Sequence, residues 1–252
     1  MITVNNLLIE NIPTLVVEKK DMQNERLPTV IYYHGFTSAK EHNLPLAYLL
    51  AEKNYRVLLP DSLYHGAREE DVSKEHVQLS FWEIVLQNVK EFRTLYNYLV
   101  NNHYILDERV GVAGTSMGGI TTAATLVQYP EVKTAAILMG TPKLTSFATE
   151  LISFINKEKE VVSHEDKEEL LNMLKPYDLS LHVDALNDRP LMFWHGEKDE
   201  TIPFNQSFSF YEQLKRSSDD KKNIIFYREA NSVHKVSRYA IIKTVDWFEK
   251  QL

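Results

Sequence analysis

The sequence predicts an α/β protein with a mostly parallel central sheet that carries helices on both faces. Strand patterns alternate with helix patterns along most of the chain. The run LPTVIYY at residues 27–33 is apolar at almost every position, as expected of a parallel strand buried on both faces. A chain of 252 residues with 44% hydrophobic content also fits one large α/β domain, since such domains routinely reach roughly 250 residues.

The first half of the chain is predicted to begin with two strands at the edge of the sheet and to continue with alternating strands and helices. Residues 2–9 and 13–18 predict a strand pair at the sheet edge, because Asn11 and Pro13 interrupt the apolar pattern. A helix is predicted over residues 80–101, where Trp82, Val85 and Val89 recur at three- and four-residue spacing. The other predicted strands are 27–33, 55–59 and 109–114, and the other predicted helices are 42–53 and 120–128.

The second half continues the alternation after one interruption. Strands are predicted at 134–139, 190–194 and 223–227, with helices at 204–217 and 238–250. Residues 144–186 predict no strand and two helix-like pieces, the second opening with the capping pattern of Ser163 and Asp166. We expect residues 1–252 to form a single domain in which 144–186 is a small helical cap insertion. Two ordinary packing helices are the alternative.

Composition excludes several classes of function. The net charge is −7 and no block of basic residues occurs, which argues against nucleic acid or an anionic membrane surface as a partner. The absence of cysteine excludes disulfides, thiolate metal sites and cysteine nucleophiles. No apolar run approaches the roughly 18 residues of a membrane span, and the first residues lack the basic start of a signal peptide. We therefore expect a cytoplasmic protein.

The segment between strand 109–114 and helix 120–128 holds the strongest motif. Gly114-Thr115-Ser116-Met117-Gly118 is a G-x-S-x-G with a strand before it and a helix after it. Such a sharp turn forces the serine into a strained backbone conformation and exposes its hydroxyl. The residues two before and two after lie so close together that only glycine fits.

Two nucleotide-binding motifs share this glycine-rich appearance. A phosphate-binding P-loop requires lysine where Ile120 stands. A dinucleotide-binding fingerprint requires glycine where Ser116 stands. Neither motif is complete, so the serine is the chemically informative residue. A tight strand-to-helix turn with an incidental serine is the remaining alternative.

Two further polar residues follow later strands and complete a nucleophilic arrangement. Asp199 follows strand 190–194 and His234 follows strand 223–227, so both are expected at the carboxyl edge of the sheet with Ser116. A serine hydroxyl needs a base to take its proton, and imidazole titrates near neutral pH and needs a carboxylate to hold its tautomer. Glu197 competes with Asp199 for the acid role, but the Ile202-Pro203 that follows favours Asp199.

Acyl transfer also requires donors for the charge that develops on the carbonyl oxygen. The Met117 N–H lies at the start of the helix after Ser116 and supplies one predicted donor. The Phe36 N–H, just past strand 27–33, is the expected second donor, and Gly35 lets the backbone approach closely.

Together these segments resemble the α/β-hydrolase superfamily, and within it the prolyl-oligopeptidase and dienelactone-hydrolase-like esterases. The resemblance covers residues 15–252 and rests on His34-Gly35-Phe36, Gly114-Thr115-Ser116-Met117-Gly118-Gly119, His195-Gly196-Glu197-Lys198-Asp199 with Ile202-Pro203, and His234. It implies an α/β-hydrolase fold with Ser116 as nucleophile, Asp199 as acid and His234 as base. Phe36 and Met117 would then form the oxyanion hole. One departure is that no glycine directly precedes His234.

We therefore expect a serine hydrolase that cleaves small carboxylic esters through an acyl-enzyme on Ser116, without a cofactor or a metal ion. A peptidase or thioesterase with the same residues is the nearest alternative, and a non-catalytic binding protein on this scaffold is the more distant one. Candidate pocket residues, which could equally be ordinary core, are Tyr64, His65, Trp82, Phe147 and Leu151, with Phe154 beside them. The sequence leaves the natural ester and the oligomeric state open.

Overall fold

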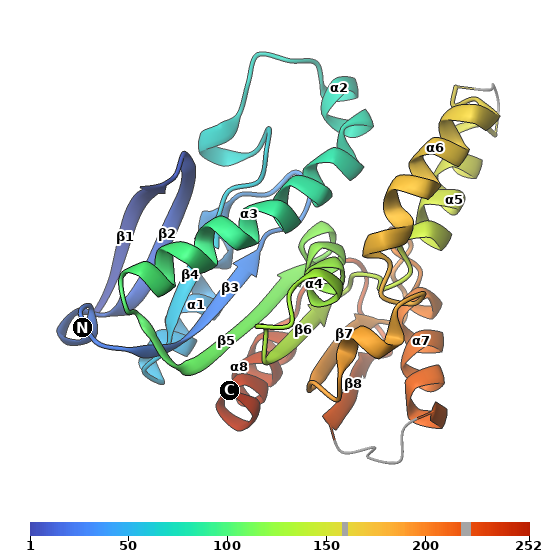
Figure 1. Ribbon diagram of the computed structural model, residues 1–252. Helices are drawn as coiled ribbons and strands as arrows, with labels where there is room; N and C mark the ends of the chain where they lie inside the picture. The colour runs from blue at the N-terminus through green and yellow to red at the C-terminus, as the bar shows by residue number, and fades with distance from the viewer. Residues whose placement is uncertain (158–160, 218–222) are drawn as a thin grey trace.

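A computed structural model describes residues 1–157, 161–217 and 223–252 and confirms the predicted fold class (Figure 1). These residues form an eight-stranded sheet in the order β1-β2-β4-β3-β5-β6-β7-β8. β1 pairs with β2, and β2 with β4, in antiparallel fashion, whereas the remaining neighbours are parallel. The strands are β1 (Ile2–Ile9), β2 (Ile12–Lys19), β3 (Leu27–Tyr33), β4 (Arg56–Pro60), β5 (Ile105–Thr115), β6 (Thr134–Leu138), β7 (Leu191–Gly196) and β8 (Ile224–Glu229).

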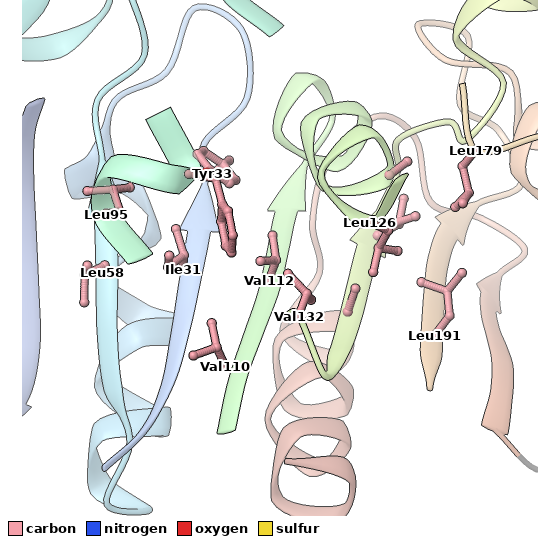
Figure 2. Packing of buried hydrophobic residues seen from close by; sticks show 14 of the residues in the cluster. Ile31, Tyr33, Leu58, Leu95, Val110, Val112, Leu126, Val132, Leu179 and Leu191 are labelled. Atoms are coloured by element: carbon pink, nitrogen blue, oxygen red, sulfur yellow. The ribbon is translucent and has the colours of Figure 1, made fainter. Parts of the chain in front are cut away.

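Helices cover both faces of this sheet, and the alternation of side chains along β3 shows why. Val30 and Tyr32 belong to the cluster formed with α1 and α8, while Ile31 and Tyr33 belong to the cluster formed with α3, α4 and α7. Figure 2 shows the face of the sheet that carries Ile31 and Tyr33, with Leu95 of α3 and Leu126 of α4 near the strands. The helices are α1 (Leu44–Glu52), α2 (Lys74–Leu79), α3 (Phe81–Asn101), α4 (Met117–Gln128), α5 (Leu144–Ile155), α6 (His164–Leu174), α7 (Phe204–Ser217) and α8 (Arg238–Gln251).

The helices and strands of the structure differ from the prediction in three places: two boundaries and one additional helix. β5 begins at Ile105 rather than at residue 109, because Ile105 pairs with Leu27 before the ladder shifts register. α4 begins at Met117 rather than at residue 120, directly after Ser116. The short helix α2 was not predicted, and it forms because the Ser73 side chain accepts a hydrogen bond from the His76 N–H.

The predicted insertion 144–186 holds α5, α6 and two 3-10 turns, and its described residues contain no strand. Residues 158–160 of that range lie outside the described part of the chain. Figure 1 shows α5 and α6 side by side, projecting beyond the sheet. Leu179 and Leu186 nevertheless join the main core cluster with α4. The assignment of 144–186 as a cap on a single domain stays a prediction.

Candidate active site

Ser116 occupies the sharp turn between β5 and α4, with φ 56° and ψ −116°. A Cβ added to Gly118 would lie 2.1 Å from the carbonyl oxygen of Tyr33, and one added to Gly114 would lie 2.2 Å from the carbonyl oxygen of Gly118. Real side chains cannot adopt such contacts, so both glycines are required. The Ser116 N–H donates to Leu138 O at 2.9 Å, which ties the turn to β6. The strained backbone is therefore held by its neighbours on both sides.

The structure brings Ser116, His234 and Asp199 into one hydrogen-bonded chain. The Ser116 Oγ lies 2.8 Å from His234 Nε2, and His234 Nδ1 lies 2.7 Å from Asp199 Oδ2. Because a carboxylate only accepts, Nδ1 of His234 carries the hydrogen, and Nε2 is left to accept the serine proton. Glu197, the alternative acid, instead forms an ion pair with Arg228 at 3.5 Å.

The carboxylate of Asp199 is buried and held by several donors. Its Oδ1 accepts from the backbone N–H groups of Thr201 and Ile202 at 2.9 and 3.0 Å. Its Oδ2 accepts from His195 Nε2 at 3.1 Å as well as from His234. Burial by itself raises the pKa of Asp199, but these hydrogen bonds outweigh it and hold that pKa well below its usual range. The group is therefore a carboxylate at neutral pH.

The loop that carries His234 passes directly over the end of β7. Ser232 O accepts from the Lys198 N–H at 3.0 Å, and a Cβ on Gly196 would lie 2.4 Å from the same Ser232 oxygen. The close approach that allows His234 to reach Asp199 therefore depends on Gly196.

Phe36 and Met117, the predicted oxyanion donors, flank Ser116. Gly35 lies against the serine turn, because a Cβ placed on it would be 3.5 Å from Ser116 Cβ. Met117 is the first residue of α4, and its N–H precedes the first intrahelical hydrogen bond, Ile120 N to Ser116 O at 3.0 Å. Among the described residues, neither N–H donates to a protein acceptor. Both remain proposals for the oxyanion hole.

Two buried histidines brace the loop that contains Phe36. His34 Nε2 accepts from the Ser62 N–H at 3.0 Å, and His65 Nε2 accepts from the Thr37 N–H at 3.0 Å. Their Nδ1 atoms then donate to the carbonyl oxygens of Gly35 and Leu63 at 2.8 and 2.7 Å. Burial lowers the pKa of His34 to about 4, so its ring is neutral at physiological pH. His65 therefore supports the loop, and its role as a pocket residue stays a prediction.

A buried ion pair, which the sequence analysis did not predict, also holds the loop that contains Phe36. Lys40 Nζ lies 2.5 Å from Asp61 Oδ2, and the backbone N–H groups of Lys40 and Ala67 also donate to this carboxylate at 3.0 and 2.9 Å. Asp61 directly follows the buried strand β4, which was the available signal. The pair locks the segment after β3 to the segment after β4.

An open cavity and an apolar cluster both adjoin the Ser116 turn, and Phe36 belongs to both. A cavity of about 510 Å³ adjoins Ser116 and His234, and its lining includes Tyr32, His42 and Lys235. Tyr64, Trp82, Phe147 and Leu151 do not line this cavity but pack in an apolar cluster that includes Phe36 and Met117. Trp82 is 7% and Phe147 4% exposed, whereas Phe154 is 77% exposed. Their role in a substrate pocket stays a prediction.

No group of three or more His, Asp or Glu side chains in the described residues converges on a position suited to a metal ion. Within the same ranges, none of the helices has the length and apolar character needed to cross a bilayer.

The family profile described as "Prolyl oligopeptidase family" matches residues 85–252. The chain belongs to the prolyl oligopeptidase family. This family member is 41% identical over 255 residues to "Putative esterase YitV" of Bacillus subtilis (strain 168), with 100% of both chains covered. It is 30% identical over 252 residues to "Esterase YjfP" of Escherichia coli (strain K12), again with 100% of both chains covered.

Solved structures give the same fold. TT1662 from Thermus thermophilus superposes with a TM-score of 0.79 at 17% identity, and the match covers 100% of this chain and 98% of that chain. Together with the family match, this confirms the predicted α/β-hydrolase fold.

Proposed function

We propose that this protein is a serine hydrolase that cleaves small carboxylic esters through an acyl-enzyme on Ser116. The observation that carries the proposal is the continuous hydrogen-bonded chain from Ser116 through His234 to Asp199. Full-length relatives named as esterases support the ester as substrate class. The sequence-based expectation of a cytoplasmic location belongs to the same proposal, and cell fractionation tests it.

The mechanism follows from the positions of the hydrogens. His234 Nε2 accepts the Ser116 proton as Oγ attacks the ester carbonyl, and Asp199 stabilises the imidazolium that forms. The N–H groups of Phe36 and Met117 hold the oxyanion, a contribution of about 3 kcal/mol per donor in comparable enzymes. His234 then donates the proton to the departing alcohol. Water activated by the same imidazole releases the acid.

This proton path assigns the two sides of the site. The alcohol must depart next to His234, so the cavity that His234 lines takes the leaving group. The acyl chain then lies on the opposite side, toward the apolar cluster that holds Met117, Trp82 and Phe147. The pocket residues expected from the sequence therefore become candidates for acyl selectivity.

The experiment measures hydrolysis of p-nitrophenyl acetate and butyrate together with covalent labelling by a fluorophosphonate probe. We expect turnover and labelling in the native protein, and loss of both in Ser116→Ala at an unchanged melting temperature. Ser153→Ala, an exposed serine of α5, is the matched control. Equal turnover in native protein and Ser116→Ala contradicts the proposal.

A peptidase is the second candidate, because the family description names a peptidase. The same triad serves both reactions. Parallel assays on aminoacyl p-nitroanilides and on acyl-CoA thioesters separate these alternatives from an esterase. The native protein is expected to have its largest kcat/KM on the oxygen esters.

A further inference from the structure

His195 is a buried histidine that the proposed mechanism does not use. It is the penultimate residue of β7, and its side chain is 1% exposed. Its ring points to the turn that carries Asp199, and it packs edge-on against Phe204 with ring centroids 5.8 Å apart.

The contacts of His195 define which ring nitrogen carries the hydrogen. Nε2 lies 3.1 Å from Asp199 Oδ2 and 2.9 Å from the Ile202 carbonyl oxygen. Both neighbours are acceptors, so Nε2 must be the donor, shared between them. Asp199 Oδ2 therefore receives one N–H from His195 and another from His234.

The other nitrogen distinguishes His195 from the two histidines that brace the loop near Phe36. His34 and His65 each use both ring nitrogens in hydrogen bonds. Nδ1 of His195 is buried, and no described residue forms a hydrogen bond with it. An unpaired buried polar atom destabilises the folded state. A residue selected for packing alone would avoid that cost, whereas one needed for its Nε2–H would retain it.

We propose that His195 is a positioning residue for the acid, which fixes Asp199 Oδ2 against His234 and shares the charge of that oxygen. The turn amides of Thr201 and Ile202 hold only Oδ1. Without His195, Oδ2 is held only by His234, which is the residue that it has to position. The His195 hydrogen bond also withdraws negative charge from Oδ2, so it moderates the stabilisation of the His234 imidazolium.

Two consequences follow for the reaction. Loss of the donor leaves more charge on Oδ2, which favours the imidazolium and moves the acid limb of the kcat/KM profile to higher pH. Loss of the anchor loosens the acid and base, and misplacement of catalytic groups costs up to roughly 100-fold in rate. KM is expected to change little, because His195 does not line the described cavity beside Ser116.

The test compares His195→Gln with His195→Met, which have similar volumes and differ in whether an amide N–H is available to donate. The pH dependence of kcat and kcat/KM is measured on p-nitrophenyl acetate. We expect the acid limb of His195→Met to move upward by about half a pH unit or more and kcat to fall roughly tenfold. His195→Gln should restore both toward the native values. His164→Met, at an exposed histidine, is the control.

An unmoved limb, or one moved to lower pH, in folded His195→Met overturns the inference, as does a failure of His195→Gln to restore it. If His195→Met does not fold, His195→Phe is measured in the same way, because its ring fills the site without a donor. The inference rests on the proposed ester hydrolysis, and the two fail differently. Absence of turnover in the native protein contradicts the proposed function. If the native protein is active but the acid limb of the kcat/KM profile does not move in His195→Met, only the role of His195 is contradicted.

Discussion

Ser116 Oγ and His234 Nε2 lie 2.8 Å apart although 118 positions separate them in the chain. Their strands are not neighbours, since β6 and β7 lie between β5 and β8 in the sheet. The loop after β8 therefore has to cross the ends of two strands. It does so by packing its backbone against Gly196, which makes the position of His234 depend on a residue of β7.

The first prediction concerns this crossing. Gly196→Ala places a Cβ 2.4 Å from Ser232 O, so the loop must move and carry His234 with it. We expect kcat on p-nitrophenyl acetate to fall by roughly 100-fold because a small displacement of the base is costly. The melting temperature should also fall, in line with about 1–3 kcal/mol of overpacking. Native-like turnover in the variant would show that His234 does not depend on this contact.

The second prediction separates the two candidate acids. Asp199→Asn should lower kcat by about 10⁴-fold, because an amide no longer holds the tautomer of His234 that accepts the serine proton. Glu197→Gln should leave kcat within about twofold, because Glu197 pairs with Arg228 on the surface and such pairs are weak. The measurement is kcat at saturating aryl ester. The reverse ranking would move the acid role to Glu197.

The third prediction tests the acyl side. Leu151 of α5 packs at the edge of the apolar cluster that contains Met117. Leu151→Ala should therefore raise kcat/KM for longer acyl chains relative to acetate, as measured on p-nitrophenyl esters from acetate to decanoate. Phe154→Ala is the control on the same helix, because Phe154 is 77% exposed. An unchanged chain-length profile in Leu151→Ala would place the acyl chain elsewhere.

The fourth prediction concerns the pH dependence of stability. His34 has a pKa of about 4 in the folded protein, below the ordinary value near 6.5. Between these values the unfolded chain binds the proton and the folded chain does not, so stability rises with pH. The native protein should lose melting temperature as pH falls from about 6.5 to about 4.

His34→Gln should show a weaker dependence over this window, and His164→Gln, which changes an exposed histidine, should match the native protein. Differential scanning calorimetry across the window measures all three. Parallel curves for the native protein and His34→Gln would exclude His34 as the source of the dependence.

Much of the site was predictable because its requirements are local. Gly114, Ser116 and Gly118 fall within five consecutive residues, so the sequence displays their spacing directly, although the contact that requires glycine at 118 is with Tyr33 of β3. Asp199 and His234 were predicted because parallel strands bring their carboxyl ends to one edge. The class of fold followed in the same way from the alternation of apolar strands and amphipathic helices.

Other features depend on contacts that no local pattern contains. The sharing of Asp199 Oδ2 by His195 and His234 requires the exact path of the turn after β7, and the bracing of the loop by Lys40 and Asp61 requires two segments to meet. The helix and strand ends also moved, as at β5, because pairing with a neighbouring strand outweighed local propensity.

The sequence by itself therefore determined the fold class and the order of the three side chains in the proposed catalytic triad. Backbone sterics and the periodicity of apolar residues act over a few positions and are readable along the chain. The tertiary structure decided which groups hold the Asp199 carboxylate, that Gly196 leaves room for the loop of His234, and where the open space beside Ser116 lies. These depend on distances between segments, which only packing of the whole chain sets.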